Sequence, residues 1–157
     1  MNPDQAIISL FVPFSAEVEF IRARKLIWEH QRNWRRAFLP SGQQLRGLEE
    51  WEAVASKMAP ASVGGAAVLD FEHALCSGLH GKQDLLISET LGRTGLLLAK
   101  QVEPSACLPV VNGWENNLYI TAADYSWTFV RTHEEPHIGP FFLRALPSFA
   151  LTEAGWD

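Results

Sequence analysis

Apolar and polar residues alternate most regularly in the C-terminal third of the chain. Apolar or aromatic side chains recur at every second position in 118–123 and again in 127–132, which is typical of half-buried β-strands. The connection between them, A-D-Y-S at 123–126, predicts a hairpin built around a type I turn. Proline and glycine then interrupt the chain, and residues 141–143 are predicted to return as a third strand.

A period of three to four residues marks the N-terminal part of the chain and predicts two helices. Ser15 is a suitable N-cap, and Leu39-Pro40 ends the pattern, so the first helix is predicted over 15–38. Its apolar stripe comprises Phe20, Ala23, Ile27, His30, Trp34, Ala37 and Phe38. The second helix is predicted over 43–58, and the short connection makes the two helices antiparallel neighbours.

Shorter apolar runs complete the predicted elements. Residues 6–12, 66–71 and 96–102 are expected to be strands, and the leucine spacing within 72–95 predicts one or two short helices. Helices followed by strands along the chain favour an α+β fold over an alternating one. We therefore expect a single domain, residues 1–157, with an antiparallel or mixed sheet of about five strands and the two N-terminal helices packed on one face.

The strand pattern also predicts how the core is packed. Trp127 and Phe129 are two positions apart, so both side chains should lie on the same side of the sheet. We expect them to be buried against the apolar stripe of the first helix, at Ile27, Trp34 and Phe38.

The composition places the chain among globular proteins. It has 157 residues, of which 47% are hydrophobic and 20% charged. No apolar run approaches the ~20 residues of a membrane span, and the first apolar run lacks a basic flank, so neither a membrane segment nor a signal peptide is expected. The two cysteines form no framework, which fits a reducing cytoplasm.

The net charge of −5 hides an uneven distribution. Residues 22–36 hold six basic residues and one acidic residue, whereas the rest of the chain holds seven basic and seventeen acidic residues. A basic helix could contact nucleic acid. Because the rest of the chain is acidic, we expect instead that the basic face of the helix is solvated and lies beside acidic residues of the same chain. A nucleic-acid partner is therefore the less favoured interpretation.

Residues 133–137 match the zinc-protease motif H-E-x-x-H, with His133, Glu134 and His137 in the metal and base positions. That motif needs a helix to place both histidines on one face. Pro136 lies inside the would-be helix, where it removes a donor and costs about 3 kcal/mol. A polar loop at the end of a strand is the preferred interpretation, with no metal or cofactor, and a small metal-dependent hydrolase is an alternative.

Other candidate groups have simpler structural explanations. Cys76 lies near two histidines, but a small buried cysteine is commoner than a metal ligand. His30 falls on the apolar stripe of the first helix and is expected at the core. Trp28 lies beside that stripe and Trp114 in a predicted loop, so at least one of them should be exposed, as tryptophans that anchor partners are.

Residues 118–143 contain three short motifs: W-T-F-V at 127–130, T-H-E at 132–134 and G-P-F-F at 139–142. With these motifs the segment resembles an uncharacterised family of small bacterial proteins, one of the domains of unknown function. Compact bacterial α+β proteins of this kind are similar to immunity proteins, which neutralise a toxin by binding it. The resemblance implies no catalytic residues.

These observations lead to a functional hypothesis. We expect a non-catalytic, cytoplasmic binding protein of the immunity type, whose partner is a basic toxin domain. The partner site should combine negative charge with an aromatic anchor, because charge steers encounter and aromatic side chains hold complexes. The outer face of the second helix, with Glu49, Glu50 and Glu52, is one candidate. The hairpin end and the loop after it are favoured, because a turn can enter a cleft and loops more often carry recognition. The residues of this favoured site are Asp124, Tyr125, Glu134 and Glu135. A metal-dependent hydrolase and a nucleic-acid-binding module that uses the basic first helix are the alternatives.

Overall fold

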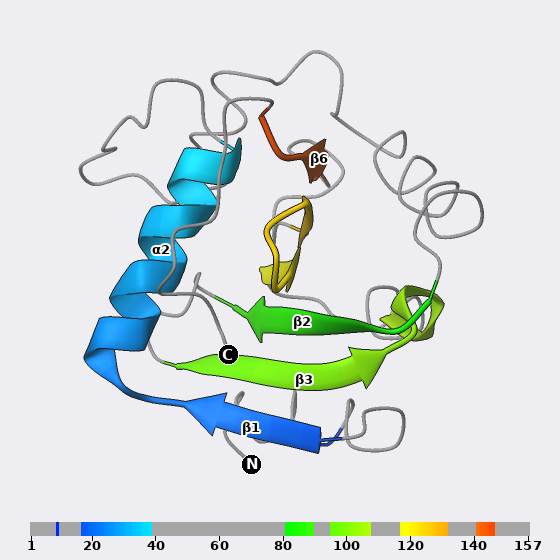
Figure 1. Ribbon diagram of the computed structural model, residues 1–157, viewed down its shortest axis with the longest axis horizontal. Coiled ribbons are helices and arrows are strands. Elements are labelled where there is room, and N and C mark those ends of the chain that lie inside the picture. Colours follow the sequence, from blue (N-terminus) through cyan, green and yellow to red (C-terminus); the bar gives the residue numbers. More distant parts are fainter. Residues whose placement is uncertain are drawn as a thin grey trace.

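The computed structural model describes residues 9, 17–38, 81–89, 95–107, 117–131 and 141–146. Within these ranges the fold is α+β, with six antiparallel strands in the order β1-β3-β2-β4-β5-β6 (Figure 1). The strands are β1 (Glu17–Ile21), β2 (Gln83–Ser88), β3 (Leu96–Val102), β4 (Leu118–Ala122), β5 (Trp127–Arg131) and β6 (Phe141–Arg144). The helical elements are α2 (Arg24–Phe38) and the short 3₁₀ helix η3 (Pro104–Cys107).

The predicted hairpin is confirmed. β4 and β5 pair antiparallel from Leu118 opposite Arg131 to Thr121 opposite Thr128. The third strand predicted over 141–143 is confirmed as β6. It pairs antiparallel with β5, and Phe142 lies opposite Phe129. The strand predicted over 96–102 is also confirmed, as β3.

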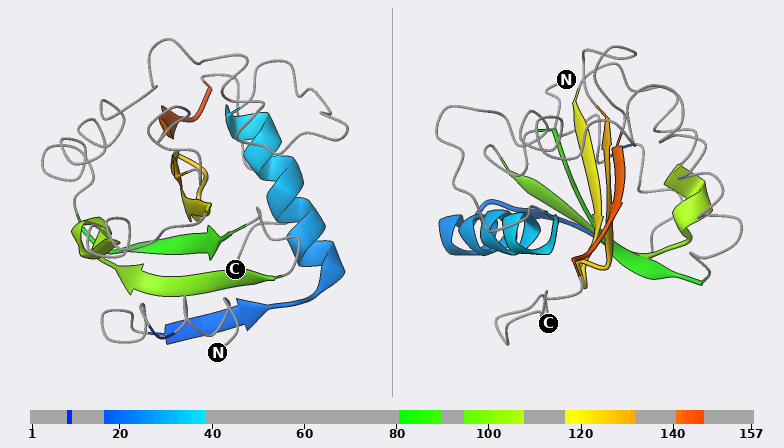
Figure 2. Two further views of the ribbon diagram at one scale, coloured as in Figure 1. Left: turned by 180° about the vertical axis from the view of Figure 1, so that it is seen from behind. Right: turned by 90° about the horizontal axis from the view of Figure 1, so that it is seen from above.

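Two hydrophobic clusters lie on opposite faces of the sheet. α2 covers one face and η3 lies on the other (Figure 2). On the α2 face, the helix residues Trp34 and Phe38 pack with Tyr119 and Val130. On the η3 face, Cys107 packs with the buried sheet residues whose side chains point to this face. Those residues are Leu85, Ile87, Leu97, Ala99, Val102, Leu118, Ile120, Ala122, Trp127 and Phe129.

The predicted packing of the tryptophan in β5 is half right. Trp127 and Phe129 do share one face and are buried, but that face carries η3, not α2. The helix instead covers their neighbours Thr128 and Val130. All four residues are buried, so the alternation separates the two faces without showing which of them receives the helix.

The predicted start of the first helix is wrong. Residues 17–21 form the strand β1, and α2 begins at Arg24. The segment E-V-E-F-I alternates at period two, and Val18 and Phe20 pack on the η3 face of the sheet. The first turn of a helix is costly to form, because several residues are fixed for one hydrogen bond. Pairing with β3 gives each residue of 17–21 a partner in the neighbouring strand, and this outweighs the helix-start signal at Ser15.

The helical prediction within 72–95 is wrong for the part that the structure describes. Gln83–Ser88 is strand β2, between β3 and β4. Its last four residues are buried, because the sheet is covered on both faces at this point. A short run that is apolar on both sides has no strand alternation, so its leucine spacing can imitate a helix.

Several other predictions lie outside the described residues. They include the second helix at 43–58 and the strand at 66–71. Of the strand predicted over 6–12, the structure describes Ser9, which is helical and exposed.

Gly95 provides a test of how β1 sits against β3. Its φ is +151°, and a Cβ there would overlap the ring of Phe20. We expect Gly95→Ala to lower the free energy of unfolding by roughly 1–3 kcal/mol, through backbone strain and overpacking. Chemical denaturation measures this difference. Gly81→Ala is the matched control, because Gly81 has a φ of +82° but open space around it. An equal loss in both variants would contradict the proposed overlap with Phe20.

Candidate functional site

The turn of the β4–β5 hairpin is held by hydrogen bonds at its tip. The Tyr125 backbone N–H donates to the Ala122 carbonyl at 2.8 Å. Asp124 Oδ1 accepts from both the backbone N–H and the hydroxyl of Ser126, at 3.0 and 2.7 Å. Aspartate favours turns because its side chain can bond to the backbone two residues on in this way. The exposed carboxylate of Asp124 is therefore held in a fixed position.

Tyr125, which was expected to anchor a partner, is not at the surface. Its side chain is buried, and its hydroxyl lies 2.8 Å from Nδ1 of His30 on α2. Its φ of +60° is uncommon for a residue other than glycine and turns the side chain back towards the helix. The prediction of Tyr125 as a partner-binding residue is therefore corrected: it fastens the hairpin turn to α2.

The prediction of His30 as a core residue is confirmed. The side chain is 1% exposed, and burial lowers its pKa from 6.5 to about 3. The imidazole is consequently neutral at pH 7.

A second buried hydrogen-bonded link lies beside it, between α2 and the hairpin strands. Trp34 Nε1 donates to Thr128 Oγ1 at 3.1 Å, and that hydroxyl lies 2.9 Å from Thr121 Oγ1. These contacts satisfy polar groups that would be costly to bury alone. Together with the His30–Tyr125 contact, they fix the orientation of the hairpin relative to the helix.

A β-bulge holds the second carboxylate near the hairpin end. The pairing of β2 with β3 shifts by one residue between Gln83 and Leu85, so two residues of β3 face Asp84. Gln101, in the bulge, has a φ of +55°, and its N–H donates to Asp84 Oδ1 at 3.0 Å. Asp84 also accepts at its backbone carbonyl, from the Ala123 N–H at 2.8 Å. It thus connects the bulge to the hairpin turn.

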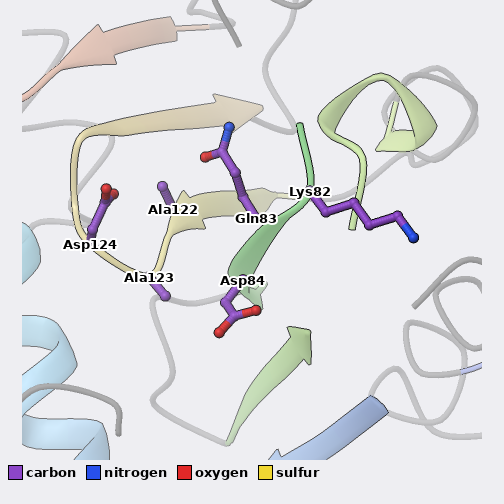
Figure 3. A pocket seen from close by; sticks show the side chains of 6 residues that line it. All are labelled: Lys82, Gln83, Asp84, Ala122, Ala123 and Asp124. Atoms are coloured by element: carbon purple, nitrogen blue, oxygen red, sulfur yellow. The ribbon is translucent and has the colours of Figure 1, made fainter. Parts of the chain in front are cut away.

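Between the start of β2 and the turn lies a pocket of about 350 Å³, which we call the hairpin recess. It is lined by Lys82, Gln83, Asp84, Ala122, Ala123 and Asp124. Figure 3 shows Gln83 and Asp124 on one side of the backbone, Asp84 on the other, and the end of Lys82 directed away. Trp127 Nε1 donates to Gln83 Oε1 at 3.1 Å, which orients that amide. The two alanines contribute small side chains to its wall.

Of the residues that line the recess, Asp124 is the one that was predicted from the sequence. Asp84 was missed because its segment was assigned to a helix, and the recess forms only when β2 pairs with β4. The other two predicted partner residues, Glu134 and Glu135, lie outside the described residues, as do His133 and His137 of the zinc motif. Among the residues that the structure does describe, no group of three or more His, Cys, Asp or Glu side chains could hold a metal ion.

The described cysteine has the properties of a core residue. Cys107 is buried, and burial raises the pKa of its thiol to about 12. A thiol that stays protonated at neutral pH is a poor nucleophile. Cys76, which was weighed as a metal ligand beside two histidines, lies outside the described ranges.

The other notable surface is the outward face of α2. Trp28 is 57% exposed, which agrees with the prediction that at least one of Trp28 and Trp114 lies at the surface. The guanidinium of Arg32 lies 5.5 Å from the centre of the Trp28 ring. Arg24 and Lys25, one turn before Trp28, are exposed as well. We call these four residues the α2 basic face. In the part of the chain that can be described, no helix has the length and apolar composition needed to cross a membrane.

Comparison with known proteins places the chain in no family. No protein-family model matches it, and the searches of curated proteins and of solved structures gave no match.

Proposed function

We propose that this chain is a non-catalytic binding protein of the immunity type, which occludes a basic partner protein with its hairpin end. The observation that carries the proposal is the hairpin recess, whose lining includes two aspartates on opposite sides of the backbone, each held in place by a backbone N–H donor. Charged groups that are already oriented need not lose side-chain entropy on binding. A lysine or arginine of the partner is the side chain that this recess would accept.

Two features support recognition at this end of the molecule. The Asp124 carboxylate and the Asp84 side chain are both set by backbone N–H donors, so they stay fixed relative to the sheet. The turn itself is fastened to α2 through Tyr125. The other two predicted residues, Glu134 and Glu135, give the recess no support, because β5 runs away from the turn, from Trp127 to Arg131, before the chain reaches them. Complementary charge between the recess and a basic partner accelerates encounter and excludes wrong partners.

The proposal predicts the effect of removing both charges without removing the hydrogen bonds. In the double variant Asp84→Asn and Asp124→Asn, each amide oxygen can still accept from Gln101 or Ser126. We expect the fold to persist and binding of the basic product of the neighbouring gene to weaken at least ~10-fold, mostly through slower association at low salt. Surface-based kinetics at two salt concentrations measure both effects.

The control carries the same change of charge elsewhere. Glu17→Gln with Glu19→Gln removes two negative charges from the exposed side chains of β1, which β3 separates from β2 and the recess. This variant should bind nearly as well as the natural protein. Equal weakening in both double variants would show that only net charge matters and would move the site away from the recess. Failure of the natural protein to bind would remove the immunity proposal.

A further inference from the structure

We infer that the α2 basic face is a second binding site, separate from the hairpin recess, and that it takes single-stranded nucleic acid. The observation behind this inference is an exposed indole with cationic side chains one turn before and one turn after it. The Trp28 ring is 57% exposed, Arg32 lies over it at 5.5 Å, and Arg24 and Lys25 are exposed one turn earlier. Figure 1 shows α2 as a single straight helix at the side of the sheet.

The spacing on the helix places the charges on both sides of the ring. Positions 24, 28 and 32 lie one turn apart, about 6 Å along the axis, and so share one face. Arg35 and Arg36, both half-buried, continue the positive charge towards the end of the helix. A base could stack on the indole while the neighbouring side chains contact phosphates. Proteins that bind single strands without sequence preference combine these same two elements.

An acidic protein partner fits this face less well. Protein hot spots hold a central tryptophan within a ring of contacts that excludes water. Of the four neighbours one turn away from Trp28, three are cations and the fourth is Gln31. The other exposed large apolar side chain of the described residues, Leu26, is two positions away and lies nearly opposite on the helix. Charged side chains around the indole, without apolar neighbours, favour a nucleic acid that stacks a base and places phosphates beside the cations. They are less suited to a protein interface from which water is excluded.

The charge distribution also limits what can bind. The rest of the chain is acidic, so favourable contact is confined to one helix of 15 residues, which is about 22 Å long. A short stretch of a flexible single strand can follow such a surface. A rigid duplex would extend past the helix onto the rest of the chain, whose net charge is negative. We therefore expect single strands to bind more tightly than duplexes of the same length.

The test uses a fluorescein-labelled dT20 oligonucleotide and the whole protein, with fluorescence anisotropy at 50 and 200 mM salt. Trp28→Ala should weaken binding at least ~5-fold, because stacking of one base contributes about 1–3 kcal/mol, and Trp28→Phe should restore part of the loss. Arg32→Gln should flatten the dependence of log affinity on log salt by about 0.7. Lys100→Gln, on β3, is the charge-matched control and should keep the affinity of the natural protein.

Two further probes separate the possible partners. A dT20–dA20 duplex should bind more weakly than dT20, and polyglutamate should compete poorly. Absence of dT20 binding at 50 mM salt would overturn the inference, as would equal affinity of Trp28→Ala and the natural protein. Polyglutamate that binds more tightly than dT20, and depends on Trp28, would assign the face to an acidic protein. None of these results depends on the hairpin recess, so the proposed function is tested independently.

Discussion

Trp34→Ala should lower the free energy of unfolding by about 3–5 kcal/mol, which is a large share of the stability of a typical domain. The indole of Trp34 is fully buried between the helix and the sheet, 5.5 Å from the Phe38 ring and 5.7 Å from the Tyr119 ring. Its removal would leave a cavity on the α2 face and would take away the donor to Thr128.

The same substitution six residues earlier is the control. Trp28 is on the same helix but is largely exposed, so Trp28→Ala should change stability by no more than about 0.5 kcal/mol. Urea denaturation followed by circular dichroism measures both variants. Trp34→Phe would retain most of the packing and lose the hydrogen bond, which should cost less than Trp34→Ala. Similar stabilities for Trp34→Ala and Trp28→Ala would contradict the assignment of the α2 face as core.

Acid should destabilise the protein through His30. Burial lowers the pKa of this imidazole to about 3, whereas the unfolded chain has the ordinary value of 6.5. Below pH 6.5 the unfolded state therefore binds a proton that the folded state does not. The stabilisation is complete above pH 6.5 and is lost as the pH falls towards 3, by up to about 1.4 kcal/mol per pH unit and about 4–5 kcal/mol in all.

A substitution can separate this effect from the titration of carboxylates. In His30→Asn the side chain has no proton to gain, and its amide can still reach towards Tyr125. The variant should be less stable at pH 7, because a buried ring is lost. Its stability should nevertheless fall more gently between pH 6.5 and 4 than that of the natural protein. Thermal unfolding across this pH range gives both slopes, and parallel slopes would show that His30 does not control the acid response.

Local patterns were sufficient where one signal dominated. The hairpin of β4 and β5 follows from alternation on either side of a turn sequence whose aspartate can bond to the backbone two residues on. The body of α2 follows from a stripe that includes His30, Trp34 and Phe38, which are buried. The exposure of Trp28 also follows, because its position lies beside that stripe.

Other features depended on contacts between residues far apart in the sequence. β1 became a strand because it pairs with β3, about eighty residues later, and β2 became one because it lies between two neighbours. The role of Tyr125 was decided by His30, which is 95 positions away. Neither a partner strand nor a buried acceptor is visible in the local sequence.

The candidate site shows the same division. Local sequence patterns place a charged residue, Asp124, at an exposed turn and gather basic residues on one helix. Only the tertiary structure brought Asp84 beside that turn, because the bulge at Gln101 and the pairing of β2 with β4 place it there. It also turned Tyr125 inward, because a buried imidazole and a phenol satisfy each other's hydrogen-bonding groups, whereas either alone would be costly to bury.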